Sequence, residues 1–270
     1  MIRRHYDATA THVLFIGSTG SIGRLAVDEA VRAGYATRTL ARDATRVRFD
    51  PRVDVFQGDL ADIDSLRATL DGIDGVVFTM GAHDGPCMVE KVDYGAVRNT
   101  LLALDGRKVR IALMTAIGVT YMDTDHNRVS QAHDWKRRSE RLVRASGNEY
   151  TIVCPGWFDY NDPDQQRLVF PAGRHPSPCQ SRGRRGIPQT DRAGAGQCAR
   201  MRDADHKTLE LVAERGPAQE QLDPLFAALE PDDPNRIDGV HDEENFPDCR
   251  QPKRVREDMA RIAGLAHKAV

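Results

Sequence analysis

The sequence predicts an α/β protein with a doubly wound parallel sheet and a small C-terminal lobe. From residue 12 to about residue 170, short apolar runs alternate with segments of helical periodicity. The runs VLFI (13–16) and GVVF (75–78) lack polar residues, which is typical of parallel strands covered on both faces. A glycine-rich loop, residues 17–23, joins the first apolar run to the first helical segment. These three observations together indicate the fold class.

The expected strands are segments of five to seven residues that contain apolar side chains and alternate with helical segments. In chain order they cover residues 11–17, 36–41, 53–57, 75–81, 109–115, 150–156 and 208–213. All but the last alternate with helical segments, so we expect them to pair in parallel.

The expected helices have apolar residues at helical spacing. Residues 21–34 show this most clearly, because one face carries Ile22, Leu25, Ala26, Ala30 and Val31. Gly34 is the expected C-cap of that helix, and Asp62 or Asp64 lies near the start of the next. The full set covers residues 21–34, 62–70, 94–104, 130–146, 219–229 and 255–269.

The pattern breaks over residues 171–202, which contain no Leu, Val or Phe but hold seven arginines, five glycines and four prolines. One interpretation is a disordered basic loop. The interpretation that we favour is a frameshift product, because a second reading frame can encode SRKQIAQVLVSAL, an amphipathic helix that suits the fold. We therefore divide the chain into an N-terminal tail (1–11), a main domain (12–170), this irregular segment (171–202) and a C-terminal substrate lobe (203–270).

The bulk composition excludes several classes of protein. The formal net charge is −2 and no run of 18 apolar residues occurs, so we expect neither a nucleic acid nor a membrane as partner. Five cysteines without CxxC spacing predict neither a disulfide framework nor a metal site. The N-terminus lacks the apolar stretch of a signal peptide, so a cytoplasmic protein is expected. An oligomer is possible.

The loop Gly17-Ser18-Thr19-Gly20-Ser21-Ile22-Gly23 predicts a dinucleotide site. A pyrophosphate needs close approach to the backbone and N–H donors at a helix N-terminus, and glycines between a strand and a helix supply both. The alternative is a merely structural turn. In this context the loop makes the predicted sheet Rossmann-type.

Residues at the ends of later strands extend the predicted site. Arg42 follows the second strand, where it can pair with a ribose 2′-phosphate, so NADP is the expected cofactor. The adjacent Asp43 leaves NAD open, and Arg42 as a surface charge is the alternative. Asp59 can accept from the adenine amino group, or it can cap the following helix. The remaining expected contacts are Leu60, Thr79, Met80 and Gly81.

The motifs GSTGSIG, LARD, GDLAD, VVFTMGA and YTIVCPGWF, in this order, resemble those of atypical short-chain dehydrogenases/reductases of the NAD(P)H-binding, NmrA-like kind. The resemblance covers residues 12–170 and about 203–265. It implies that the nicotinamide lies near Met114, Thr115 and Ala116, with Thr115 donating to a substrate carbonyl. It also implies that Pro155 forms the nicotinamide-side wall, where Trp157 and Phe158 either line the pocket or belong to the core.

The resemblance also implies a Tyr-x-x-x-Lys pair, in which the tyrosine is the general acid. Lys136 matches the lysine and would bind the nicotinamide ribose, but Ala132 stands in place of the tyrosine. His133 is our candidate substitute acid, and Tyr121 is a second. The alternative is that Lys136 is a surface residue, one of several charges in the solvated run KRRSER (136–141).

Two functions from different classes follow. The first is an NADP-dependent oxidoreductase that transfers hydride to a small carbonyl, quinone or flavin-like acceptor. The second is a non-catalytic NAD(P)-sensing regulatory protein, which the missing tyrosine also favours. A frameshift over 171–202 would add a third outcome, an impaired copy that has lost part of its substrate lobe.

Overall fold

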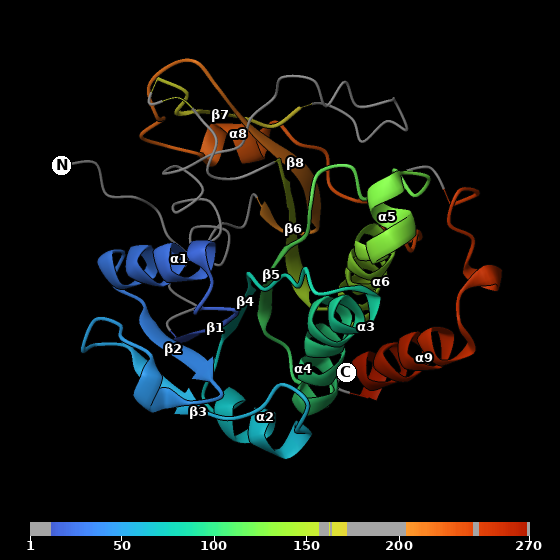
Figure 1. Ribbon diagram of the computed structural model, residues 1–270, viewed down its shortest axis with the longest axis horizontal. Helices are drawn as coiled ribbons and strands as arrows, with labels where there is room; N and C mark the ends of the chain where they lie inside the picture. The colour runs from blue at the N-terminus through green and yellow to red at the C-terminus, as the bar shows by residue number, and fades with distance from the viewer. Residues whose placement is uncertain (1–11, 157–161, 163, 172–203, 240–242, 269–270) are drawn as a thin grey trace.

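The computed structural model describes residues 12–156, 162, 164–171, 204–239 and 243–268. Within these residues one sheet of eight strands has the order β3-β2-β1-β4-β5-β6-β8-β7. All neighbouring pairs are parallel except β7–β8, which is antiparallel. Helices lie on both sides of the sheet (Figure 1). The predicted Rossmann-type, doubly wound fold is confirmed.

The strands are β1 (His12–Ile16), β2 (Ala36–Ala41), β3 (Asp54–Gln57), β4 (Gly75–Phe78), β5 (Arg110–Met114), β6 (Glu149–Pro155), β7 (Arg167–Val169) and β8 (Lys207–Glu214). The α-helices are α1 (Ser21–Arg32), α2 (Ile63–Leu70), α3 (Pro86–Val89), α4 (Gly95–Leu104), α5 (Asp125–Ser130), α6 (Ala132–Ala145), α8 (Asp223–Ala227) and α9 (Lys253–Lys268). Short 3₁₀ turns are η1 (Ala44–Arg46) and η4 (Asp248–Arg250), and η2 (Glu90–Tyr94) is a π-helical turn.

The predicted elements differ from the observed ones mainly at helix ends. The helix expected from Tyr94 is preceded by α3 and η2, which continue into α4. The helix expected over 130–146 begins at Ala132, because Gln131 adopts a left-handed conformation (φ 54°) and separates α5 from α6. The predicted C-cap of α1 is also displaced by one residue, since Ala33 is the C-cap and Gly34 follows it with φ 85°.

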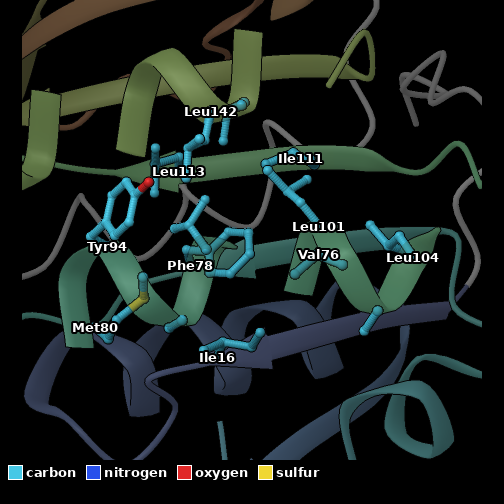
Figure 2. Packing of buried hydrophobic residues seen from close by; sticks show 14 of the residues in the cluster. Ile16, Val76, Phe78, Met80, Tyr94, Leu101, Leu104, Ile111, Leu113 and Leu142 are labelled. Atoms are coloured by element: carbon cyan, nitrogen blue, oxygen red, sulfur yellow. The ribbon is translucent and has the colours of Figure 1, made fainter. Parts of the chain in front are cut away.

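The core has two parts, one on each face of the sheet. Alternate residues of the central strands point to opposite faces, so Ile16 and Phe78 meet α4 and α6 while Phe15 and Val77 meet α1. Figure 2 shows the larger cluster, in which Leu142 of α6 packs over the same face. Side chains of β1 and β4 therefore fix the sheet between two helical layers.

Five of the six residues in the charged run 136–141 are buried and Lys136 is partly buried, so the interpretation of this run as a solvated surface was wrong. Arg137 and Arg141 are each 1% exposed, and both pair with Asp238, which is 2% exposed. Burial opposes ionisation of Asp238, but hydrogen bonds from both arginines outweigh it and hold its pKa below the ordinary value. Asp238 therefore holds the segment before α9 against α6 through ion pairs. The sequence showed the charges of α6 but not this partner.

The C-terminal part of the chain contributes to the main sheet. Strand β8 pairs in parallel with β6, and α9 packs against α6 and α4. Because the predicted segment 171–202 lies almost wholly outside the described residues, its frameshift interpretation and the predicted domain boundaries stay predictions. Among the helices described, none combines the length and the apolar character needed to cross a bilayer.

Candidate functional site

A cleft of about 1680 Å³ follows the carboxyl ends of β1, β2, β4, β5 and β6. Ligands of doubly wound sheets bind at these ends, where the strand order reverses. Here the reversal falls between β1 and β4. The predicted site residues that line the cleft are Gly17, Thr19, Gly20, Ser21, Ile22, Arg42, Asp59, Leu60, Thr79, Met80, Gly81, Thr115, His133, Lys136 and Pro155.

The glycine loop is shaped by contacts that a side chain would prevent. Gly17 has φ 90°, and a Cβ there would lie 2.5 Å from the Met80 nitrogen. A Cβ on Gly23 would lie 2.2 Å from the Gly17 carbonyl oxygen. Gly20 is the N-cap of α1 and provides no side-chain cap, so the first N–H groups of the helix lie beside the loop without a side-chain acceptor. This arrangement suits an anionic group.

Two residues of the predicted loop do not line the cleft. Ser18 is 1% exposed, and its hydroxyl oxygen is buried without a hydrogen-bond partner among the described residues. Gly23 is buried against the loop backbone. Both residues lie on the side of the loop that faces away from the cleft, because α1 approaches β1 closely there. They shape the loop without facing the cleft.

The end of β2 presents two arginines to the cleft. Arg42 and Arg46 are exposed, line the cleft, and make no ion pair with any described residue. Asp43, in contrast, caps η1 by accepting from Thr45 nitrogen (3.0 Å) and from the Thr45 hydroxyl (2.6 Å). Arg46 was not predicted as a site residue, although its position four residues after Arg42 could have indicated it.

The carboxyl end of β3 is held by local hydrogen bonds. Asp59 accepts from Ala61 nitrogen (2.9 Å), whereas the N-cap of α2 is Asp62. The helix-cap alternative for Asp59 is therefore wrong. Leu60 accepts from the Asn99 amide at 2.9 Å through its carbonyl oxygen. Asn99 lines the cleft as well, so this corner is fixed from α4.

The end of β4 forms the floor of the cleft. Thr79 donates through its backbone nitrogen to the Ile16 carbonyl oxygen at 2.9 Å and is 6% exposed. Met80 packs against the glycine loop at Gly17. A Cβ on Gly81 would lie 3.7 Å from the Lys136 ammonium nitrogen. The predicted contacts at this strand end therefore lie between the glycine loop and α6.

Thr115 lies at the end of β5, but its hydroxyl points to buried groups. It is 4% exposed, donates to a carboxylate oxygen of Glu140 (2.8 Å), and contacts Cys154 Sγ at 2.9 Å. Glu140 is 1% exposed and lies 25 residues from Thr115 in sequence. The hydroxyl proton is thus engaged by Glu140, and donation to a substrate carbonyl stays a prediction.

Lys136 pairs with a buried carboxylate that was not predicted from the sequence. Its ammonium group forms an ion pair with Asp93 of η2, whose side chain is 2% exposed. Asp93 also accepts from Ala82 nitrogen at 3.0 Å. The predicted helix started one residue after Asp93, and no sequence spacing linked it to Lys136. Ala132 lines the cleft in the position of the missing tyrosine.

His133 lines the cleft and is partly buried. Burial lowers its pKa, although the hydrogen bond to the Tyr121 carbonyl acts in the opposite direction. Because Nδ1 lies 2.9 Å from that carbonyl oxygen, Nδ1 is the protonated nitrogen and Nε2 is left as an acceptor. In the neutral form, which burial favours, the ring has no proton at Nε2 to give, and this does not favour the predicted role of acid. Tyr121 takes part in this contact through its backbone carbonyl oxygen.

Pro155 lines the cleft, and its carbonyl oxygen accepts from Ile117 nitrogen at 2.7 Å. Its predicted place beside a nicotinamide stays a prediction. Trp157 and Phe158 lie outside the described residues, so their predicted roles are not tested. No group of three His, Cys, Asp or Glu side chains among the described residues is placed to hold a metal ion.

A family model described as NAD(P)H-binding matches residues 17–183, which is more than half of the chain. The chain belongs to the NAD(P)H-binding family. The match begins at the first glycine of the loop and includes the ends of β2, β4, β5 and β6, so it covers most of the strands that line the cleft. The predicted resemblance to atypical short-chain dehydrogenases is confirmed at this level, whereas the NmrA-like subgroup stays a prediction.

Two curated relatives each match a little over half of the chain. The chain is 26% identical over 184 residues to the protein TIC 62, chloroplastic, of Pisum sativum, covering 57% of this chain and 34% of that protein. It is 28% identical over 169 residues to phenylcoumaran benzylic ether reductase Pyrc5 of Pyrus communis, covering 56% of this chain and 50% of that protein. The chain thus spans between a third and a half of the length of these relatives.

The fold also matches a solved structure. A putative NAD-dependent epimerase/dehydratase from Bacillus halodurans superposes with a TM-score of 0.67 at 20% identity. The match covers 81% of this chain and all of that one. At this identity the likeness shows the fold, and it covers a larger share of the chain than the matches to the curated relatives do.

Proposed function

We propose that this protein is an NADPH-dependent reductase that transfers hydride to an acceptor needing no acid from a side chain. The observation that carries the proposal is the cleft at the carboxyl ends of the parallel strands. It combines a glycine cradle, two arginines that make no ion pair with a described residue, and Lys136 of α6. The reductase activity named for the Pyrus communis relative supports the reaction class.

The residues present fit a dinucleotide. A Cβ on Gly17 or Gly23 would collide with backbone atoms, and the first turn of α1 has no side-chain cap, so this loop would hold the pyrophosphate. Asp59 and Leu60 would flank the adenine, and Lys136 would bind the ribose nearest the nicotinamide. A bound nicotinamide would supply the hydride, while the chain binds it, orients it and excludes water.

The preference for NADPH follows from charge at the end of β2. Arg42 and Arg46 make no ion pair with a described residue, so both are available to a 2′-phosphate. Asp43, whose carboxylate would repel that phosphate, is held by Thr45. NAD-binding folds usually use an acidic residue here to bind the ribose hydroxyl, and this acidic residue caps a turn instead.

The class of acceptor follows from the side chains near β5. Ala132 offers no proton, His133 presents an acceptor nitrogen, and Thr115 donates to Glu140. A ketone becomes an alkoxide as hydride arrives and gains from an adjacent acid. A flavin or quinone instead delocalises the arriving charge over its rings and takes its proton from solvent. We therefore propose a flavin- or quinone-type acceptor before a simple carbonyl.

The test is a titration followed by an acceptor screen. NADPH and NADH are added separately to the full chain, and nicotinamide fluorescence reports binding. We expect NADPH to bind more tightly and to be oxidised when a flavin or a benzoquinone is present. Oxidation of NADPH with simple ketones but not with these acceptors would overturn the proposed acceptor class. Failure of both nucleotides to bind would overturn the proposed function.

A second candidate function is a nucleotide sensor without turnover. The specific observation that favours it is again Ala132, since a cleft that binds the cofactor without a proton donor need not be catalytic. The same experiment separates the two functions. Tight binding of NADPH and NADP with no oxidation by any acceptor would favour the sensor.

A further inference from the structure

The pair Lys136–Asp93 connects two parts of the cleft that the chain order keeps apart. Lys136 belongs to α6 and Asp93 to η2, 43 residues earlier. The second carboxylate oxygen of Asp93 accepts from Ala82 nitrogen (3.0 Å), just after the end of β4. One buried carboxylate thus joins the ammonium group of α6 to the strand end that forms the cleft floor.

Asp93 itself is held by α6. The Ser139 hydroxyl donates to the Asp93 carbonyl oxygen at 2.8 Å. Ser139 is 1% exposed and lies three residues after Lys136, so both contacts come from one face of α6. This second contact fixes the backbone of Asp93, while Lys136 and Ala82 fix its side chain.

Helix α9 holds η2 on both sides of Asp93. The Tyr94 hydroxyl donates to Asp258 at 2.9 Å, and Arg254 forms an ion pair with Glu90. Burial raises the pKa of Tyr94, as does the neighbouring Asp258 carboxylate, so the hydroxyl remains a neutral donor. The π-helical turn places these three side chains of η2 in different environments, and such turns are frequent at functional sites.

Resting on the proposed function, we propose that Asp93 positions Lys136 for the cofactor and that α9 holds Asp93 in place through η2. A lysine side chain has four rotatable bonds and loses much entropy when a ligand orders it. Asp93 fixes the ammonium group before the cofactor arrives, so less ordering remains at binding. Helix α9 lies outside residues 17–183, so this support for Lys136 comes from beyond the part of the chain that the family model matches.

The test is a double-mutant cycle read by NADPH binding. Asp93→Asn keeps the size and an acceptor for Ala82 nitrogen but removes the charge, and Lys136→Met removes its partner. Each single variant is expected to weaken NADPH binding about tenfold, as for a coupled pair. In the Lys136→Met background, Asp93→Asn should weaken binding by less than about twofold. Equal effects of Asp93→Asn in both backgrounds would overturn the positioning role.

A separate experiment tests whether α9 holds Asp93 in place through η2. Tyr94→Phe keeps the ring but removes the hydrogen bond to Asp258, and we expect it to weaken NADPH binding about threefold only while Asp93 is present. An effect of Tyr94→Phe that is unchanged in the Asp93→Asn background would contradict the route through η2.

Two controls separate the possible failures. Asp54→Asn removes a carboxylate that pairs with Arg38 at 2.8 Å outside the cleft, so NADPH binding should stay within twofold of the parent chain. Thermal unfolding of each variant reports general damage. If the parent chain binds no nucleotide, the proposed function fails. If it binds NADPH and Asp93→Asn binds equally well, the positioning role alone fails.

Discussion

Gly23 of α1 lies directly against Gly17 of the loop, such that a Cβ on Gly23 would sit 2.2 Å from the Gly17 carbonyl oxygen. Real side chains do not approach backbone atoms this closely, so this contact sets how near α1 comes to the end of β1. The N-terminus of α1 therefore lies beside the loop because position 23 lacks a side chain.

Gly23→Ala is expected to displace α1 from the loop. The collision involves backbone on both sides, so we expect NADPH binding to weaken at least about tenfold and stability to fall by about 1–3 kcal/mol. Fluorescence titration and urea unfolding measure the two effects. The matched control is Gly264→Ala in α9, where a Cβ would meet nothing within 4 Å. That control should stabilise the protein by up to about 1 kcal/mol and leave binding unchanged.

Arg42→Ala should lower the preference for NADPH over NADH. A 2′-phosphate would lose a charge-assisted hydrogen bond worth about 1.5–3 kcal/mol, whereas NADH carries no such phosphate. We expect Arg46→Ala to act in the same direction. The measurement is the ratio of the two dissociation constants. A ratio that both variants leave unchanged would contradict the assignment of these arginines.

Thr115→Val is expected to destabilise the fold through Glu140. Valine has nearly the same shape but cannot donate to the buried carboxylate, so the free energy of unfolding should fall by about 1–3 kcal/mol. Thr115→Ser keeps the hydroxyl and should restore most of the loss. Urea unfolding reports this effect, and turnover of the folded valine variant tests the predicted contact with a substrate carbonyl.

His133 should make the protein less stable in mild acid. Its pKa in the folded state is lowered by burial from the ordinary 6.5, so the unfolded chain takes up the proton first. The stability that follows from the neutral ring is present above about pH 6.5 and is lost as the pH falls. His133→Gln should therefore show a smaller loss between about pH 7.5 and pH 5.5 in paired urea unfolding curves. Identical losses in both proteins would argue against a buried neutral ring.

Asp238→Asn should cost more stability than any exposed charge change. It leaves Arg137 and Arg141 buried without their carboxylate, which typically costs about 3–5 kcal/mol. Arg67→Gln, in an exposed pair with Asp64, is the control and should change stability by less than about 1 kcal/mol. Thermal unfolding compares the two, and similar shifts would show that the C-terminal cover contributes little.

Local sequence patterns were sufficient for most of the sheet and for half of the site. Apolar runs located β1 to β6 and β8, and the carboxyl ends of parallel strands lie at one edge, so residues such as Arg42, Thr79 and Pro155 could be assigned to one cleft. Strand β7 was missed because three residues carry too little periodicity.

The sequence by itself determined the fold class, the glycine loop and the strand ends that form the cleft, because each depends on residues adjacent in the chain. Only the tertiary structure decided which charges meet. Asp93 lies 43 residues from Lys136, and Asp238 lies 97 residues from Arg141. From the sequence alone, a charged residue is predicted to lie on the surface, because its counterion is distant in the chain and meets it only on folding. The burial of both pairs follows from the packing of α6 against η2 and the C-terminal segment, which no local pattern encodes.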